Sequence, residues 1–372
     1  MAKKASDHYC GIGGQAVLEG IMMKNEDVYA VAVRKPDGKI EVKKEEYKAK
    51  ADSKWKKLPF IRGVFNFVDS LVLGMKCLTH SAAYYEEEDV KEESAFDKVA
   101  GKLFGEKAED VFMGLTVAFS IVMAVALFMV LPYVLAELLS KVVANDTLLA
   151  LFEGLIRILI FLSYVVLISL MKDIHRVYQY HGAEHKCINC LEKGRILNVE
   201  NVKKSSRQHK RCGTSFLLFV VFISVILFFF IRVEQPVLRL LVRLALIPVI
   251  AGISYEIIRL AGKTNNIFVR IISAPGMWLQ KLTTKEPDDD MIEVAIAAIE
   301  AVFDWKEYFK TEFGYDVDDA QKVSAKSQKI AQELKEEAKM ETARLEEPES
   351  SQEVVTEEIT KDDSETEAAK ES

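Results

Sequence analysis

The polar stretch from Tyr180 to Phe216 lies between long apolar segments, and the rest of the chain is arranged around it. It begins YHGAEHKCINC (Tyr180 to Cys190) and ends SSRQHKRCGTSF (Ser205 to Phe216). Three of the six histidines and three of the five cysteines lie in it: His181, His185, His209, Cys187, Cys190 and Cys212. Imidazole, thiolate and carboxylate are the groups that bind zinc and similar metals. The stretch therefore predicts a metal-dependent site.

The composition indicates that apolar and charged segments are separated along the chain. Of 372 residues, 50% are hydrophobic and 28% are charged. The net charge of −7 is uneven, because acidic residues gather after about Lys322 while the segments beside the apolar ones are basic, so it says little about partners. Five cysteines in so long a chain do not fit a secreted disulfide scaffold and favour reduced thiols facing the cytosol. The start of the chain lacks the apolar core of a signal peptide.

Four long apolar segments predict helices that cross a membrane, because about twenty apolar residues span a bilayer as a helix. They are Val111 to Leu139, Leu148 to Met171, Ser215 to Ile231 and Val237 to Ile258. We expect the charged residues within them to pair across the spans rather than to mark a substrate pathway. These residues are Glu153, Arg157, Arg239 and Arg243. The predicted fold class is a mainly α, polytopic membrane protein of about four spans.

The loops between these segments predict the orientation of the chain. The segment Lys172–Arg211 holds ten Lys or Arg against four Asp or Glu, whereas the loops Ser140–Asp146 and Arg232–Gln235 are short and carry few positive charges. Positively charged loops stay on the cytoplasmic side. We therefore expect a multi-pass protein of the cell membrane, in contact with the lipid bilayer, with both termini and the His/Cys loop in the cytoplasm.

Composition divides the chain into five segments. These are a cytosolic β-rich segment (1–58), an amphipathic helix with an acidic linker (59–110), the transmembrane bundle (111–260) with its cytosolic loop (172–214), an interfacial or re-entrant segment followed by an amphipathic helix (261–317), and an acidic tail, helical and then disordered (318–372). Alternating residues around Pro36-Asp37-Gly38 predict a β-hairpin. Gly11, Gly13 and Gly14 match neither G-x-G-x-x-G nor a Walker loop, so tight turns are favoured over a phosphate site.

The motif H-x-x-E-H, formed by His181, Glu184 and His185, carries the sharpest chemical hypothesis. If the second span continues as a helix past Met171, the two histidines share a face and can chelate one metal. Glu184 would then act as the general base of a metal-dependent hydrolase, as in inverzincin peptidases. His209 or Cys212 would complete the ligands, with Glu256 as a third candidate. The expected cofactor is a divalent metal, zinc above all.

Other interpretations compete for the same residues. Cys187-x-x-Cys190 followed by His209-x-x-Cys212 has the spacing of a closed structural zinc site, which would support folding only. A third interpretation makes the histidines interfacial side chains, with anionic lipid headgroups bound by the basic loop. The loop's cations are Lys203, Lys204, Arg207, Lys210 and Arg211. Nucleic-acid binding is not expected, because no aromatic platform accompanies these cations.

Five motifs in order resemble the YqhQ-type family of uncharacterised bacterial multi-pass membrane proteins, described as predicted metal-dependent enzymes. The motifs are GGQAVLEGIMMKN (Gly13 to Asn25), YHGAEHKCINC, HKRCGTSF (His209 to Phe216), SYEIIRLAG (Ser254 to Gly262) and APGMWLQKLTTKEPDDDMIEVAI (Ala274 to Ile296). The resemblance covers roughly residues 8–305 and leaves out the acidic tail. In this family the position of Cys187 is often threonine, which weakens the four-ligand zinc site.

The resemblance also directs attention to polar residues without an obvious packing role. They are Gln15, Glu19, Arg62, Glu256, Arg259, Glu286, Asp288 and Asp289. A cytosolic pocket built from them is one hypothesis, with the acidic group at Glu286 to Asp289 completing a metal shell or binding a substrate cation. Helix capping by Asp288 and Asp289 is the alternative. The favoured function is metal-assisted hydrolysis, with His181, His185 and His209 as the metal ligands. Cys190 and Cys212 are alternative ligands. The alternative functions are a membrane scaffold with structural zinc and a transporter accessory protein.

Overall fold

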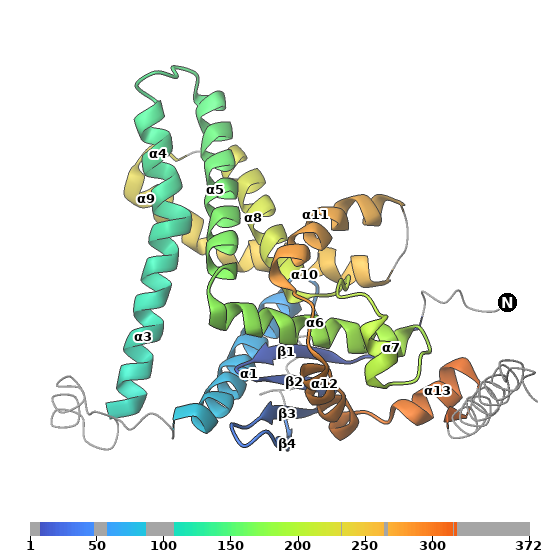
Figure 1. Ribbon diagram of the computed structural model, residues 1–372. Helices are drawn as coiled ribbons and strands as arrows, with labels where there is room; N and C mark the ends of the chain where they lie inside the picture. Colours follow the sequence, from blue (N-terminus) through green and yellow to red (C-terminus); the bar gives the residue numbers. More distant parts are fainter. Residues whose placement is uncertain are drawn as a thin grey trace, which may run out of the picture. The chain divides into compact units, whose positions relative to one another are not determined.

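The computed structural model describes residues 8–47, 58–86, 108–231, 233–263, 267–314 and 316–317. Most of the acidic linker after Glu86 and the whole acidic tail from residue 318 lie outside these ranges. The described chain is mainly helical, with one antiparallel sheet near the N-terminus (Figure 1). It divides into a unit of residues 1–308 and a second unit from residue 309. The sheet, the apolar helices and the His/Cys stretch all belong to the first unit.

The sheet is a four-stranded meander near the N-terminus. Its strands are β1 (Gly13–Val17), β2 (Gly20–Asn25), β3 (Val28–Arg34) and β4 (Ile40–Glu46), in that order. The predicted hairpin is confirmed, because β3 pairs antiparallel with β4 and Gly38 adopts the positive φ that its turn requires. Gly13 and Gly14 lie in β1 rather than in the expected tight turn, whereas Gly11 has a φ of +76°.

Helices cover both faces of the sheet. Side chains alternate between the faces of a strand, and Met22 and Val31 pack with Leu73 and Cys77 of α1 (Ile61–Glu86). Their neighbours in β2 and β3 are equally buried, and α12 (Asp289–Val302) packs on both strands. The sheet therefore shares one core with a helix that follows the last apolar stretch of the chain.

Four described helical stretches are long and apolar enough to cross a membrane, as the sequence predicts. They are Gly114–Leu139, Asp146–Ser169, Gly213–Phe230 and Pro236–Gly262. The first stretch is formed by α3 (Ala108–Val125), the π-helical turn η3 (Ala126–Val130) and α4 (Leu131–Leu139). The second is α5 (Asp146–Ser169), and the third is α8 (Gly213–Phe230). The fourth is formed by α9 (Pro236–Ala245) and α10 (Ile247–Lys263). The last pair breaks at Leu246, just before Pro248, whose nitrogen has no hydrogen to donate.

The expected pairing of charged residues across the helices is confirmed for Glu153 and Arg243, whereas the pair of Glu153 with Arg157 lies within α5. Glu153 contacts Arg157 at 2.8 Å and Arg243 at 2.7 Å, and both arginines are buried. Arg157 also donates to the carbonyl of Phe128 in the π-helical turn (3.2 Å), a place where backbone hydrogen bonding departs from the α pattern. Arg239 lies apart from them and donates to the carbonyl of Val233 at 2.6 Å.

The His/Cys stretch begins with a helix of its own, α6 (Lys172–Glu192), which turns away from α5 (Figure 1). The chain is extended at Met171, so α6 does not continue the second span, although the H-x-x-E-H motif is helical. The short α7 (Val199–Lys203) follows it. After the last apolar stretch come α11 (Ile267–Thr283) and, beyond α12, α13 (Trp305–Phe313). Pro275 lies inside α11, so this segment is one helix and not a re-entrant loop.

Candidate metal centre

Three side chains from two helices bring their ligand atoms together. His181 and His185 are one turn apart on α6, and Cys212 is the N-cap residue of α8. Their ligand atoms all lie within 4.8 Å of one another, and the Nε2 atom of His181 is 3.2 Å from the Sγ atom of Cys212. Tetrahedral zinc with two nitrogens and one sulfur would hold these atoms about 3.3–3.8 Å apart. The three positions therefore fit one ion with only small adjustments.

The hydrogen bonds of the two histidines fix which nitrogen carries the proton. The Nδ1 atom of His181 lies 2.9 Å from the carbonyl oxygen of Thr283, and that of His185 lies 2.6 Å from the carbonyl oxygen of Arg207. A carbonyl oxygen only accepts, so each Nδ1 donates and each neutral ring keeps a lone pair on Nε2. Such a backbone partner is the usual support of a metal-binding histidine. Two lone pairs thus meet one thiol, whose single proton satisfies only one of them.

The sulfur of Cys212 is held at the start of a helix. The backbone N–H of Thr214 donates to it at 3.4 Å, and the Thr214 hydroxyl lies 2.7 Å away. These contacts fix the position of the sulfur beside the two histidines. Three protein ligands would match the number found in catalytic zinc sites rather than the four of structural sites.

Glu184 lies beside these ligands, between α6 and β1. Its carboxylate accepts a hydrogen bond from the backbone of Gly14. Burial raises the pKa of Glu184, and the neighbouring His181 and the hydrogen bond from Gly14 offset this only partly. A carboxylate with a raised pKa is a better proton acceptor, which suits a general base.

A cavity of about 440 Å³ opens next to the centre and provides room for a small ligand. Glu184, His209 and Cys212 form part of its wall, and β1 and α1 form the opposite part. Lys24, Asn66 and Asp69 line it as well, none of which the sequence singled out. They come from β2 and α1, far away in the chain. Lys24 lies within the motif Gly13 to Asn25, but nothing in the sequence connected it or the two α1 residues with the central stretch.

His209 lies near the centre but outside the three-ligand group, contrary to the expectation that it would be a ligand. Its ring centroid is 5.7 Å from that of His185, and its Nε2 atom is 3.6 Å from a carboxylate oxygen of Glu192. Burial lowers the pKa of His209, and Glu192 acts in the opposite direction. Arg211 forms an ion pair with Glu192. The sequence could have indicated that Glu192 lies near the site, because Glu192 follows His185 by seven residues and therefore shares its helical face.

Cys190 and Cys187 are not brought to the centre, so the described residues do not form the four-ligand zinc site. The thiol of Cys190 lies 3.4 Å from the carbonyl oxygen of Arg195. The reason is helical geometry: nine residues at about 100° each place Cys190 roughly opposite His181 on α6. Burial raises the pKa of Cys190 to about 11 and that of Cys187 well above its ordinary value.

The additional polar residues are spread over separate contacts rather than one pocket. Gln15 lines the cavity, whereas Glu19 forms an ion pair with Arg176 of α6. Glu256 is bound by Arg62 of α1 at 2.5 Å and lies 3.8 Å from Arg259. Glu256 therefore joins α1 to α10 and is not one of the three clustered ligands.

The acidic group before α12 also lies away from the clustered ligands. Glu286 forms an ion pair with the buried Lys186 at 2.5 Å, and Asp289 forms one with Lys203 at 2.8 Å. Asp288 is the N-cap residue of α12 but makes no side-chain capping bond, and its carboxylate instead accepts from Gln179 at 3.4 Å. These contacts fasten α12 to α6 and α7.

Comparisons with known proteins agree with the resemblance seen in the motifs. A family model described as "Protein of unknown function (DUF1385)" matches residues 58–305. "Uncharacterized protein YqhQ" of Bacillus subtilis (strain 168) is 37% identical over 289 residues, which are 76% of this chain and 89% of that protein. No solved structure matches the chain. Neither description names an activity, a metal or a membrane.

Proposed function

The chain belongs to the DUF1385 family, and from its own side chains we propose that it is a metal-dependent hydrolase of the cell membrane. His181, His185 and Cys212 would hold a divalent ion, zinc above all, and Glu184 would be the general base. The four apolar helices would anchor the chain in the bilayer. The strongly positive segment between α5 and α8 supports a cytoplasmic position for the site.

One observation supports the metal site above the rest. The two Nδ1 atoms donate to the backbone carbonyls of Thr283 and Arg207, which leaves two Nε2 lone pairs facing a single sulfur. Without a cation, one of these two acceptors, of which His185 is buried and His181 partly buried, would lack a donor, which is costly in a protein interior. A divalent ion satisfies both nitrogens and the sulfur together.

The ion and the side chains near it would have different roles in hydrolysis. A divalent ion would supply Lewis-acid activation of water or of a carbonyl or phosphoryl oxygen. Glu184, held by the Gly14 backbone, would accept the proton of the attacking water and pass it to the leaving group. The hydrogen bonds of Gln280 with the backbone N–H and carbonyl of His209, at 2.8 and 2.7 Å, hold the segment before Cys212 in place.

Metal content tests the proposal directly. We would measure bound metals by plasma mass spectrometry on the full chain purified in detergent. About one zinc or similar ion per chain is expected, with loss in His181→Ala/His185→Ala and in Cys212→Ser. His175→Ala, an exposed histidine on the same helix, and Cys190→Ser serve as matched controls and should keep the ion. No metal in the wild-type chain, or equal loss in the controls, would contradict the site.

Removing the charge of Glu184 distinguishes the hypothesis of an enzyme from that of a scaffold with structural zinc. Glu184→Gln keeps the shape of the side chain, so the ion should stay bound and the unfolding temperature should change little. Hydrolysis of a panel of ester, peptide and phosphodiester substrates should fall by about 10²- to 10⁴-fold in this variant. A wild-type chain that binds its ion yet hydrolyses none of these would favour the scaffold.

A further inference from the structure

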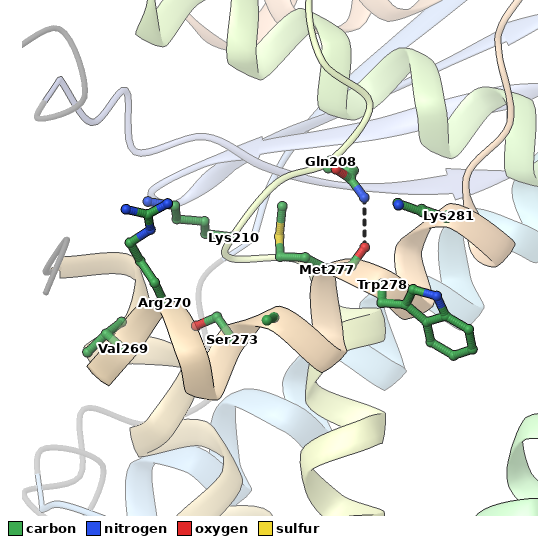
Figure 2. Close-up of a pocket in the computed structure, with 9 residues that line it drawn as sticks. Gln208, Lys210, Val269, Arg270, Ser273, Met277, Trp278 and Lys281 are labelled. Carbon is green, nitrogen blue, oxygen red and sulfur yellow. Dashed lines mark hydrogen bonds between the residues drawn. The ribbon is translucent and has the colours of Figure 1, made fainter. Parts of the chain in front are cut away.

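A second cavity, of about 350 Å³, lies between α11 and the segment of residues 208–210 (Figure 2). Three cations line it, and none of its lining residues is acidic. In Figure 2, Lys210 and Arg270 lie at one end, and Lys281 lies at the other end beside Gln208. Arg270 and Lys281 have no ion-pair or hydrogen-bond partner among the described residues. The cavity therefore offers at least two cations, Arg270 and Lys281, whose charge no described residue neutralises.

A buried hydroxyl in the same wall also lacks a partner. Ser273 is 9% exposed, and its Oγ atom makes no hydrogen bond to any part of the chain that the structure describes. Buried polar groups without a partner are rare in native proteins, so each one calls for an explanation. A ligand with acceptor oxygens would take the hydroxyl's proton and face the cations at once.

The helix that carries these groups also exposes apolar side chains. Ile271 is 63% exposed, Ile272 50% and Trp278 52%. α11 packs against α8 and α5, which are two of the helices able to span a bilayer. Tryptophan beside cations is typical of the boundary between lipid and water. These features place the cavity where a lipid headgroup, rather than a soluble phosphate, would reach it.

We propose that this cavity binds the phosphate headgroup of an anionic phospholipid. Arg270, Lys281 and Lys210 would neutralise the charge, and Ser273 would donate to a phosphate oxygen. The acyl chains would lie along the exposed apolar face of α11. The amide of Gln208 is already used, since it donates to the carbonyl of Met277 at 2.8 Å (Figure 2); its role is to hold the two walls together.

This site differs from the basic loop that the sequence suggested for lipid binding. Most of the loop's cations are engaged within the protein: Lys203 with Asp289, Lys204 with Glu200, and Arg211 with Glu192. Of that loop, Lys210 lines the cavity. The inference rests on membrane insertion of the apolar helices but is independent of the metal centre.

Native mass spectrometry of the full chain in detergent tests the site. The chain would be titrated with phosphatidylglycerol, with phosphatidylcholine of the same acyl chains, and with inorganic phosphate. Wild-type protein should retain phosphatidylglycerol, and Arg270→Ala/Lys281→Ala should weaken that retention roughly 30-fold, because each cation near an anionic headgroup contributes about a fivefold gain. Ser273→Ala should weaken it by a smaller factor. Lys203→Ala/Lys204→Ala is the matched control and should leave it unchanged.

Each other outcome counts against the proposal. Equal retention of phosphatidylglycerol and phosphatidylcholine would show that the headgroup charge does not matter. An equal effect of Lys203→Ala/Lys204→Ala would show that the lipid binds at the basic loop instead. Displacement of the lipid by an equal concentration of inorganic phosphate would identify a soluble anion as the ligand. Thermal unfolding of each variant confirms that it is folded. The metal content of each variant should match the wild type, so that a loss of lipid binding can be distinguished from a loss of the metal centre.

Discussion

A Cβ atom on Gly14 would lie 2.9 Å from the carboxyl carbon of Glu184, so the absence of a side chain at this position of β1 makes room for the Glu184 carboxylate of α6. We expect Gly14→Ala to displace the Glu184 carboxylate and to lower the free energy of unfolding by about 1–3 kcal/mol. Thermal unfolding in detergent measures this. The metal content should stay at the wild-type value, because the atoms nearest to this position belong to Met23 and Glu184 and not to the three clustered residues.

Gly13→Ala is the matched control in the same strand. A Cβ atom there has no neighbour within 4 Å, so the change in stability should stay within about 0.5 kcal/mol. Equal effects of the two substitutions would mean that Gly14 matters for the strand and not for the room it leaves to Glu184.

A second close contact lies between α6 and the segment before α12. A Cβ atom on Gly182 would lie 2.0 Å from the carbonyl oxygen of Lys285, and the backbone N–H of Lys285 donates to the carbonyl of Tyr178 at 2.8 Å. Since a backbone atom cannot swing aside, Gly182→Ala should destabilise the chain by about 3 kcal/mol or more. The folded yield and the unfolding temperature would report it. Gly114→Ala, whose Cβ atom meets nothing within 4 Å, should be harmless; if both variants unfold alike, the contact is not as described.

Glu153 is the single acid between two buried arginines, and its charge holds them together. Glu153→Gln would leave Arg157 and Arg243 without a counter-ion, and removal of one partner of a buried pair costs about 3–5 kcal/mol. We expect a marked loss of folded protein after detergent extraction, measured by size-exclusion chromatography. The exposed Glu137 gives the control Glu137→Gln, which should behave like the wild type. A stable Glu153→Gln chain would show that the arginines find other partners.

Thiol reactivity distinguishes Cys212 from the other cysteines of the stretch. At pH 7 a thiol with a pKa of about 11 is ionised in roughly one molecule in 10,000, so Cys190 should resist methyl methanethiolsulfonate, as should Cys187. Cys212 lines the cavity and should react first in metal-free protein, and added zinc should slow it. Peptide mapping after timed quenching would show the order. Modification of Cys190 before Cys212, or no protection by zinc, would contradict the assignment.

The helices, the hairpin and the ion pairs of the apolar segments were predictable because local patterns determine them. Long apolar runs identified α5 and α8, and alternation around Gly38 identified the β3–β4 hairpin. The burial of Arg157 and Arg243 followed from the cost of an unpaired charge. The residues that cover the sheet's second face were not predictable, because α12 reaches it from the other end of the chain.

The candidate site was predictable where one helix determines it and unpredictable where two segments meet. The spacing of His181 and His185 placed both on one face of α6 without further information. Whether Cys212 or His209 joins them depends on how the chain enters α8, and Gln280 binds the backbone at His209 from 71 positions away. No pattern near either residue encodes that contact.

The contact of Arg34 with Glu293, at 3.0 Å, joins the β-sheet to α12 across 259 positions. On the ribosome, about 13–50 s would pass between the synthesis of these two residues at about 5–20 residues per second. During this interval the face of the sheet that bears Ile21 and Met23 lacks the cover of α12, although the apolar helices have already been synthesised. The N-terminal strands must therefore wait until α12 has been synthesised, and a chain cut before α12 would leave them open to aggregation.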